Sequence, residues 1–338
     1  MTSKIKPISD TTGRTRLAEA VPLTTPYSVY IYPTTYCNFK CNYCAHSLGT
    51  DGMAKQYGFV KENMSLETYQ KSIGQLCEFP KKIKLLSLTG QGEPLLNKDL
   101  PEMVRIAKES GRFERIEIIT NGSLLTNQLS DELIESGLDT LRVSLQGISS
   151  DKYKEICGVS VNFNKFIDNM QYFYEKKGDT QLFIKVLDIA LEVEEEKLFY
   201  QLFRDCTDRM FIEKLQPAYS GVELTNNMSI KHDRYGREVT ERNVCPLAFF
   251  MLGVFPNGDI QPCDTLYRPV ILGNVYSNTI INMWKGDILK DFWKLQLQKK
   301  RHENNGCSQC CAPTDVSHPE DILDDASELL FNKIEASS

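Results

Sequence analysis

Strand-like and helix-like segments alternate over residues 27–216, and this alternation limits the possible folds more than any other feature of the chain. The strand-like segments are rich in β-branched and aromatic residues and occupy 27–33, 82–90, 115–122, 140–147, 181–190 and 209–216. Segments with helical patterning lie between them, at 65–76, 100–111, 129–137, 163–178 and 195–206. Strict β/α alternation predicts a parallel sheet with right-handed crossovers. Six units are too few for a full eight-fold barrel, so we expect an α/β fold with an open or partial (β/α)6 TIM barrel.

Three cysteines, Cys37, Cys41 and Cys44, directly follow the first predicted strand in the sequence CNFKCNYC. Chemistry in such folds lies on loops at the carboxyl ends of the strands, so these thiols are expected at the barrel mouth. A [4Fe–4S] cluster held by three cysteines keeps one iron without a protein ligand, where a small molecule can bind. A zinc site with a distant fourth ligand, such as His46, is the alternative.

A second group of cysteines lies near the C-terminus, at Cys245, Cys263, Cys307, Cys310 and Cys311. The segment from Cys245 to Cys263 ends in a predicted hairpin with a Pro-Asn-Gly turn. Four thiols on a small hairpin-plus-helix unit can fully ligate one metal centre, and the spacing alone favours structural zinc. The remaining cysteines are interpreted as small buried hydrophobic side chains: Cys77, Cys157 and Cys206.

Composition excludes several classes of function. The net charge of −6 argues against a broad surface for nucleic acid or for an anionic membrane. The N-terminal residues have no apolar signal-peptide region, and no apolar run reaches membrane-spanning length. We therefore expect a cytoplasmic protein with no nucleic-acid or membrane partner. In a reducing compartment, eleven cysteines indicate metal or redox chemistry rather than disulfides.

The first cysteine group resembles the C-x3-C-x-aromatic-C motif of the radical S-adenosylmethionine (radical SAM) superfamily, with Tyr43 in the aromatic position. That family has a partial (β/α)6 barrel, and the resemblance covers residues 28–216. It implies that Cys37, Cys41 and Cys44 hold a [4Fe–4S] cluster whose unique iron binds the methionyl amine and carboxylate of S-adenosylmethionine. Reductive cleavage would give a 5′-deoxyadenosyl radical that removes a substrate hydrogen. A reductant such as flavodoxin or ferredoxin is the expected protein partner.

The sequence TGQGEPLLN (89–97) is similar to the Gly-Gly-Glu-Pro motif of this family, with Gln91 at a position where glycine is usual. The similarity implies that Gly92 and Glu93 contact the cofactor and that Glu93 hydrogen-bonds the methionyl amine. A carboxylate pairs well with an ammonium group in a low-dielectric pocket. Taken alone, the segment would be read as a Gly/Pro turn with a solvated glutamate.

Three residues on or after later strands resemble further cofactor contacts. The resemblance implies that Asn121 lines the pocket, that Ser144 reaches the ribose or the carboxylate, and that Lys185 pairs with the carboxylate. An ordinary Asn-Gly turn at Asn121 and Gly122 is an equally good interpretation. A lone lysine on a strand is often solvated, which is the alternative for Lys185.

The C-x12-G-x4-C spacing from Cys245 is similar to the start of the SPASM/twitch auxiliary-cluster extension of radical SAM enzymes, and 272–286 resembles a later part of it. No cysteine follows Cys311, so the resemblance implies the shorter twitch form with one auxiliary [4Fe–4S] cluster. The implied ligands are Cys245, Cys263, Cys307 and Cys310. Cys311 is surplus, and it could replace Cys310, donate a hydrogen atom or be inert.

The predicted organisation has four parts. An N-terminal extension or flexible arm (1–27) precedes the radical SAM partial barrel (28–225), a small twitch/SPASM-like auxiliary iron–sulfur domain (226–315) and a C-terminal helix (316–338). The polar segment 226–244 is a linker that could also roof the active site. The C-terminal helix is acidic and amphipathic, and we expect it to pack on the barrel.

The spacing of the auxiliary cysteines is most similar to that of the aminocyclitol (inosamine) dehydrogenases of aminoglycoside biosynthesis. This implies a radical SAM oxidoreductase that oxidises a secondary alcohol of a carbohydrate or cyclitol, with the auxiliary cluster as electron acceptor. Glu213, Lys214 and Gln216 on the last predicted strand would contact the substrate or supply the base. The alternatives are an epimerase of a sugar or peptide, in which a cysteine such as Cys311 returns the hydrogen, and a zinc-stabilised scaffold without catalysis.

Overall fold

The computed structural model describes residues 3–7, 14–226, 228–239, 241–315 and 318–336. Within these residues, ten strands form one sheet in the order β1-β7-β6-β5-β4-β3-β2-β8-β9-β10. The six predicted strands are consecutive parallel neighbours in it: β2 (Ser28–Ile31), β3 (Leu85–Leu88), β4 (Ile116–Thr120), β5 (Thr140–Leu145), β6 (Gln181–Leu187) and β7 (Arg209–Glu213). The expected α/β partial barrel is confirmed.

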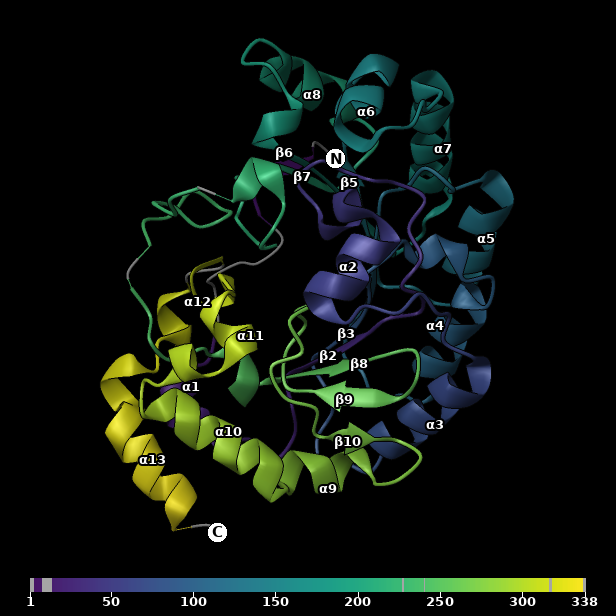
Figure 1. The fold of residues 1–338 in the computed structure, drawn as a ribbon. Helices are drawn as coiled ribbons and strands as arrows, with labels where there is room; N and C mark the ends of the chain where they lie inside the picture. The colour runs from purple at the N-terminus through teal and green to yellow at the C-terminus, as the bar shows by residue number, and fades with distance from the viewer. Residues whose placement is uncertain (1–2, 8–13, 227, 240, 316–317, 337–338) are drawn as a thin grey trace.

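The five predicted helices are also present, and four of them form an arc outside the strands in Figure 1. They are α3 (Leu66–Leu76), α4 (Leu100–Glu109), α5 (Asn127–Glu135), α7 (Phe163–Lys176) and α8 (Glu195–Phe203). Helical spacing aims their apolar residues at the sheet, as in α7, where Phe166, Met170 and Phe173 are buried. The Ser65 hydroxyl caps α3 by accepting a hydrogen bond from the Thr68 N–H (3.1 Å).

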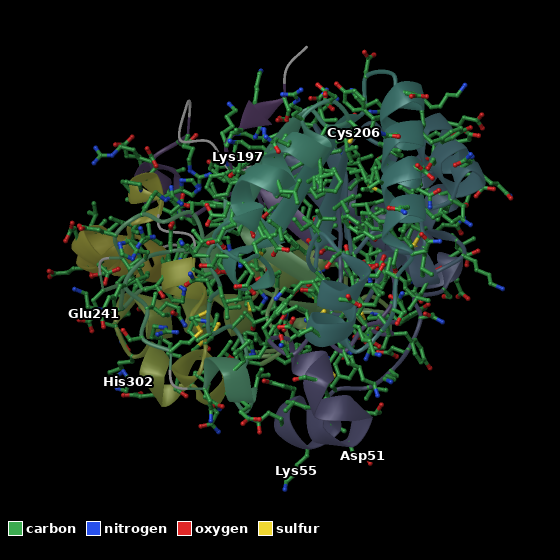
Figure 2. All side chains as sticks on the ribbon, turned by 90° about the horizontal axis from the view of Figure 1, so that it is seen from above. Asp51, Lys55, Lys197, Cys206, Glu241 and His302 are labelled. Carbon is green, nitrogen blue, oxygen red and sulfur yellow. The ribbon has the colours of Figure 1, made fainter. Side chains whose placement is uncertain are left out.

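Two helices within the barrel region were not predicted. α2 (Gly49–Tyr57) follows the first cysteine group, and Figure 2 labels Asp51 and Lys55 on its outward-facing side. α6 (Ser150–Cys157) follows β5 and lies behind the same cysteine loop. α2 buries only Met53 and Tyr57, and the buried residues of α6 begin at Tyr153, so neither segment shows an apolar stripe over its whole length.

The predicted C-terminal hairpin is present and continues the barrel sheet. β8 (Met251–Val254) pairs in parallel with β2, and β9 (Asp259–Gln261) pairs antiparallel with β8. Gly258 in the turn has φ +86°, a left-handed conformation that favours glycine. β10 (Gly273–Asn274) completes the sheet. Cys263, which follows β9, is therefore carried on an extension of the barrel's own sheet.

The last helices are α9 (Ile280–Lys285), α10 (Asp287–Leu297), α11 (Asn305–Ser308), α12 (Ala312–Asp315) and α13 (Ser327–Glu335). α13 buries Leu330 and Ile334 and packs against α10, with Lys294 Nζ 2.5 Å from Glu335 Oε1. The expectation that the C-terminal helix packs on the barrel is wrong. Its apolar stripe predicted that it would be buried, but a stripe does not specify the partner.

The described parts of the N-terminal segment are held in place. β1 (Lys4–Ile5) pairs in parallel with β7, and α1 (Leu17–Ala20) leads to the buried Val21. The expectation of a flexible arm is therefore wrong for these parts, while residues 8–13 lie outside the described residues. In the described part of the chain, no helix combines the length and apolar character that a membrane span requires.

Candidate cofactor and substrate sites

Cys37, Cys41 and Cys44 lie on one loop that runs from β2 toward the short 3-10 helix Ala45–Leu48. The end of α6 holds this loop through its backbone carbonyls. The Lys40 N–H donates to the Cys157 oxygen (3.2 Å), and the Asn42 N–H donates to the Ile156 oxygen (2.8 Å). These bonds lie on both sides of Cys41, so the loop conformation is set by contacts distant in sequence.

The surroundings of these cysteines suit thiolates bound to iron. The Phe39 N–H donates to Cys37 Sγ (3.4 Å), a contact that favours the thiolate. Burial raises the pKa of the Cys37 and Cys44 thiols, that of Cys37 to about 12, so a bound metal is needed to hold them as thiolates. In the described part of the chain, no three His, Cys, Asp or Glu side chains converge on a single metal ion. Cysteine ligands of a [4Fe–4S] cluster each bind a different iron and need not converge in this way.

His46, the fourth ligand of the zinc alternative, is engaged elsewhere. Its Nε2 lies 2.8 Å from the carbonyl oxygen of Gln91, an arrangement in which the ring N–H donates. Burial lowers the pKa of His46, which favours the neutral ring. Gln91 thus contacts the cysteine loop through its backbone, which any residue at this position could supply.

The segment 89–97 packs directly onto the cysteine loop. The Glu93 N–H donates to the Tyr36 carbonyl oxygen (2.7 Å). A Cβ atom on Gly92 would lie 2.3 Å from the same oxygen and 2.8 Å from the carbonyl carbon of Thr35. Gly92 is therefore required by the close approach of two backbones, and the two sequence motifs form one site.

We predict that Gly92→Ala displaces the cysteine loop, because the added Cβ would clash with backbone atoms. The expected result is a loss of about 1–3 kcal/mol in the free energy of unfolding, as for other overpacked sites. Urea unfolding and the iron content of reconstituted protein measure it. Gly74→Ala is the control, because an added Cβ meets nothing within 4 Å in α3 and should stabilise by about 0.5–1 kcal/mol. Unchanged iron content and stability in Gly92→Ala would contradict the prediction.

The Glu93 carboxylate is 2% exposed and is oriented by three donors. Oε1 accepts from the Thr120 hydroxyl (2.5 Å) and the Leu95 N–H (3.0 Å), while Oε2 accepts from the Asn121 N–H (2.7 Å). Burial raises the pKa of Glu93, and these hydrogen bonds oppose the shift. A carboxylate offers about four acceptor positions, so room for one further donor remains. Its role toward the methionyl amine stays a prediction.

Asn121 hydrogen-bonds the cysteine loop. Its Nδ2 donates to Asn38 Oδ1 (2.9 Å), and its Oδ1 accepts from the Ser123 N–H (2.9 Å). Gly122 follows with φ +73°, so the Asn-Gly turn is also present. Both interpretations of this residue hold for its structure, and a contact with the cofactor stays a prediction.

A cavity of about 220 Å³ opens at the carboxyl ends of β5, β6 and β7. It brings together six predicted site residues: Tyr43, Ser144, Lys185, Glu213, Lys214 and Gln216. Its remaining lining residues are Leu145, Val186, Leu187, Leu215, Ala218, Tyr219 and Arg234. Tyr43 lies between two cysteines of the first group, so the cavity adjoins the cysteine loop.

An ion pair lies in the wall of this cavity. Lys185 Nζ lies 2.6 Å from Glu213 Oε2, and Arg234 Nη1 lies 3.8 Å from the same oxygen. Burial alone would raise the pKa of Glu213, but the charges of Lys185 and Arg234 outweigh it and the pKa is lowered. Burial also lowers the pKa of Lys185, although Glu213 opposes this shift. Lys185 thus has a carboxylate partner within the chain, and its role toward S-adenosylmethionine stays a prediction.

Lys214 lies at the rim of the cavity. Its side chain is 56% exposed, and its Nζ is 3.4 Å from Asp188 Oδ2. Neighbouring residues of a strand point in opposite directions, so Lys214 faces away when Glu213 faces inward. This placement favours Glu213 over Lys214 as a substrate contact.

Four cysteines of the second group surround one small cavity: Cys245, Cys263, Cys307 and Cys310. Apolar side chains form much of the remaining wall, and Cys311 does not line it. The Arg301 guanidinium donates to the carbonyl oxygens of Cys307 (2.5 Å) and Cys310 (2.7 Å) and fixes the last turn. Burial raises the pKa of the Cys245 thiol to about 12. Four thiols around an apolar space fit a metal centre with four cysteine ligands.

This arrangement predicts different outcomes for the two adjacent cysteines. Cys310→Ala is expected to lose the auxiliary iron, because one of four thiols around the cavity is removed. Cys311→Ala is expected to keep it, since the Cys311 side chain does not line the cavity. Iron and sulfide content of each variant after anaerobic reconstitution measures the difference. The reverse pattern would make Cys311 the ligand.

Two site residues were not identified from the sequence. Arg234, in the polar segment 226–244, donates from Nε to Asp315 Oδ1 (2.8 Å) and lines the barrel cavity. It thereby connects Glu213 of the barrel with the residues after the auxiliary cysteines. This contact agrees with the expectation that the segment roofs the site. A single arginine in a charged linker shows no sequence pattern that would predict its place in the barrel cavity.

Asp264 is the second such residue, and it directly follows Cys263. Burial raises the pKa of Tyr30, Tyr32 and Tyr219, and the negative charge of Asp264 adds to the shift in each case. The carboxylate is thus close enough for its charge to affect these tyrosines, although Asp264 lines neither the barrel cavity nor the four-cysteine cavity. Its own pKa is raised by burial and by Asp315. The only sequence signal was its position next to a predicted metal ligand.

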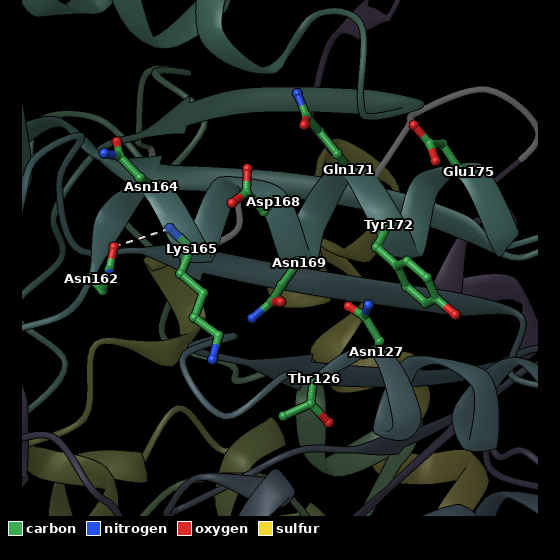
Figure 3. Close-up of a pocket in the computed structure, with 10 residues that line it drawn as sticks. All are labelled: Thr126, Asn127, Asn162, Asn164, Lys165, Asp168, Asn169, Gln171, Tyr172 and Glu175. Atoms are coloured by element: carbon green, nitrogen blue, oxygen red, sulfur yellow. Dashed lines mark hydrogen bonds between the residues drawn. The ribbon is translucent and has the colours of Figure 1, made fainter.

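A larger hollow of about 810 Å³ lies on the outside of the barrel between α5 and α7 (Figure 3). Thr126 and Asn127 line one side and polar residues of α7 line the other, with the Lys165 side chain extending between them. None of the predicted site residues lies there. Among the scattered cysteines, Cys157 and Cys206 are buried, as expected for small apolar side chains, and Figure 2 labels Cys206 near α8.

Comparison with protein families gives two matches. The Radical SAM superfamily model matches residues 31–196, and the SPASM iron–sulfur cluster-binding domain model matches residues 245–311. The second match begins and ends at cysteines of the second group. The chain thus carries a radical SAM domain followed by a SPASM domain.

Curated relatives carry the name GTP 3′,8-cyclase. The probable enzyme of Metallosphaera sedula is 35% identical over 126 residues, which is 37% of this chain and 36% of that protein. The enzyme of Chlorobaculum tepidum is 36% identical over 135 residues, which is 38% of this chain and 35% of that protein. The matches therefore span little more than a third of these relatives. They do not carry the name of an inosamine dehydrogenase, which the cysteine spacing had suggested.

Solved structures share the fold over most of the chain. BtrN in complex with AdoMet and 2-DOIA is 18% identical, with a TM-score of 0.54 over 86% of this chain and 96% of that one. Streptococcus suis SuiB bound to S-adenosylmethionine is 18% identical, with a TM-score of 0.62 over 88% of this chain and 73% of that one. At these identities the likeness concerns the fold alone.

This domain composition is that of a radical SAM enzyme with a SPASM domain. The two domains imply a SAM-binding [4Fe–4S] cluster, an auxiliary iron–sulfur cluster and S-adenosylmethionine. Both cysteine groups fit these cofactors, because one loop presents three thiols and one apolar cavity is bounded by four.

Proposed function

We propose that this protein oxidises a secondary alcohol of a carbohydrate or cyclitol to a ketone. The observation that carries the proposal is the single cavity surrounded by Cys245, Cys263, Cys307 and Cys310. A cluster with four cysteine ligands has no open iron for a substrate, so its expected role is electron transfer. A net oxidation needs such an electron acceptor.

The residues that would hold the cofactors are the two cysteine groups. Cys37, Cys41 and Cys44 would hold the SAM-binding cluster, and the four cysteines of the cavity would hold the auxiliary one. When bound, the first cluster together with S-adenosylmethionine would supply hydrogen-atom abstraction from carbon, and the auxiliary cluster would supply an acceptor for one electron. Oxidation of an alcohol to a ketone also releases the hydroxyl proton, so the chain itself must provide a base.

Asp264 is the proposed base. It directly follows Cys263, and its charge acts on Tyr219, which lines the barrel cavity. It also lies close enough to Arg234 for that cation to affect its carboxylate. Asp264 lines neither cavity, so the proposal rests on its place next to Cys263 and on its nearness to Tyr219 and Arg234. In the proposed reaction it would accept the hydroxyl proton while the auxiliary cluster accepts the electron.

The names of the curated relatives suggest GTP as another substrate. Two observations favour a smaller molecule without phosphate groups. The cavity of about 220 Å³ is smaller than the roughly 300–1,000 Å³ usual for ligand pockets. Lys185 and Arg234, which line it, are each paired with a carboxylate that is 1% and 18% exposed, respectively, and a triphosphate would have to compete with these partners.

Epimerisation is the second candidate, and the position of Cys311 favours it. Cys311 does not line the auxiliary cavity, and the charges of Asp315 and Arg234 both act on its thiol. Cys311 directly precedes α12, whose Asp315 accepts a hydrogen bond from Arg234 of the barrel cavity (2.8 Å). A thiol near the substrate would return a hydrogen atom to the opposite face of the carbon.

Product analysis separates these reactions. Reconstituted protein is incubated with S-adenosylmethionine, dithionite and a cyclitol, and products are measured by mass spectrometry. Alcohol oxidation predicts a product two mass units lighter, formed with an equal amount of 5′-deoxyadenosine. Epimerisation predicts a product of unchanged mass that takes up deuterium from the solvent and is lost in Cys311→Ala. Conversion of GTP but not of the cyclitol would reject both proposals.

A further inference from the structure

We propose that Glu213 and Gln216 form a recognition pair for a small polyhydroxylated substrate, which binds through its hydrogen-bond donors and not through phosphate or carboxylate groups. The inference rests on the proposed oxidation for the identity of the site. It adds the residues that select this substrate and the kind of group through which it binds.

The first argument is that two buried oxygen atoms, which can accept hydrogen bonds, have no donor. Glu213 is 1% exposed and Gln216 is 7% exposed, and both line the barrel cavity. In the described part of the chain, neither Glu213 Oε1 nor Gln216 Oε1 has a hydrogen-bond partner. The other polar atom of each side chain is engaged: Glu213 Oε2 by Lys185 (2.6 Å), and Gln216 Nε2 by the His232 carbonyl oxygen (3.2 Å). These bonds fix the side chains, so rotation cannot relieve the unpaired oxygens.

The second argument concerns the cations of the cavity. Lys185 pairs with Glu213 and Lys214 with Asp188, while Arg234 pairs with Asp315 through Nε and Nη2. An anionic ligand would have to displace one of these carboxylates from its partner. The cavity therefore offers free acceptors while its cations are occupied, and this balance selects hydroxyl or ammonium groups over phosphate.

The third argument is position. The predicted contacts to S-adenosylmethionine end with Ser144 on β5 and Lys185 on β6, whereas Glu213 ends β7 and Gln216 follows it. Arg234, on the same side, reaches toward Asp315 beyond the auxiliary cysteines. The two free acceptors thus lie between the predicted cofactor contacts and the auxiliary domain, where a second substrate must sit.

Ligand binding to the holoenzyme tests the pair without depending on turnover. Reconstituted protein saturated with S-adenosylmethionine is titrated calorimetrically with scyllo-inositol, with scyllo-inosamine and with GTP. Gln216→Met should weaken polyol binding by about 3- to 10-fold, the usual value of one neutral hydrogen bond. Glu213→Gln should weaken it by about 10-fold or more, because a charged acceptor is lost. Gln171→Met, an exposed position on α7, is the matched control and should change the Kd by less than about twofold.

Each outcome of the titrations supports or overturns the proposed recognition pair. Tighter binding of scyllo-inosamine than of scyllo-inositol would identify ammonium as the preferred donor, and equal binding would identify hydroxyl groups. The proposal is overturned if GTP binds most tightly, if neither polyol binds the wild type, or if both variants bind the polyols normally. An equal loss of affinity for S-adenosylmethionine would assign the acceptors to the cofactor instead. Polyol binding without ketone formation would reject the oxidation and leave the recognition pair standing.

Discussion

A Cys37→Ala/Cys41→Ala/Cys44→Ala triple variant is expected to lose all reductive cleavage of S-adenosylmethionine and about four of about eight irons per chain. The reason is that these thiols lie on one loop, while the four auxiliary thiols surround a separate cavity. Iron and sulfide analysis after anaerobic reconstitution, with 5′-deoxyadenosine measured after dithionite reduction, gives both values. Retention of full cleavage activity would contradict the assignment of the first cysteine group as the ligands of the SAM-binding cluster.

Cys77→Ala is the matched control for this experiment. Cys77 is a half-buried cysteine at the end of α3, outside both groups, and its removal should leave the iron content unchanged. A wild type with about four irons, falling to none in the triple variant with one zinc retained, would make the second group structural. The reaction would then be a redox-neutral one such as epimerisation, because no second cluster would accept an electron.

Replacing Asp264 by asparagine is expected to slow ketone formation by about 10²- to 10⁴-fold, the usual contribution of a general base. The amide keeps the size of the side chain but cannot take up the hydroxyl proton. Reductive cleavage of S-adenosylmethionine and the iron content should both persist, because the ligands of both clusters are cysteines and none of them is changed. The measurement is the ratio of ketone to 5′-deoxyadenosine, which should fall as cleavage becomes uncoupled from oxidation.

Asp287→Asn serves as the control, since the Asp287 side chain is 93% exposed on α10. A normal ketone yield in Asp264→Asn would remove Asp264 from the mechanism. Loss of iron in the same variant would instead assign the carboxylate to supporting the auxiliary site. The two readouts therefore separate a base from a residue that holds Cys263 in place.

The local elements of the barrel were predictable because each depends on residues close in sequence. The apolar residues of β2 to β7 and the stripes of α3 and α7 report which face is buried, and the Ser65 cap marks a helix start. The three thiols of the CNFKCNYC loop were likewise visible in the sequence. Three thiols leave one iron of a [4Fe–4S] cluster without a protein ligand, and this number indicated a site where a small molecule binds.

Features that depend on distant partners were not predictable in the same way. The apolar stripe of α13 required burial, but only the folded chain places it on α10. The hairpin of β8 and β9 was expected, yet its pairing with β2 needs contacts between residues more than 200 positions apart. Local patterning encodes how much of a segment is buried and leaves its partner open.

The same division applies to the site. The sequence by itself determined which thiols are grouped, and the resemblance of these groups and of the Gly92-Glu93 motif to a known family indicated iron–sulfur ligands rather than zinc ligands. Tertiary structure alone decided which polar groups share a cavity: it pairs Lys185 with Glu213, brings Arg234 over both, and leaves Cys311 outside the four-thiol cavity. Spacing along a chain limits which atoms can ligate one centre, whereas the charge and free acceptors of a pocket depend on side chains that meet only after folding.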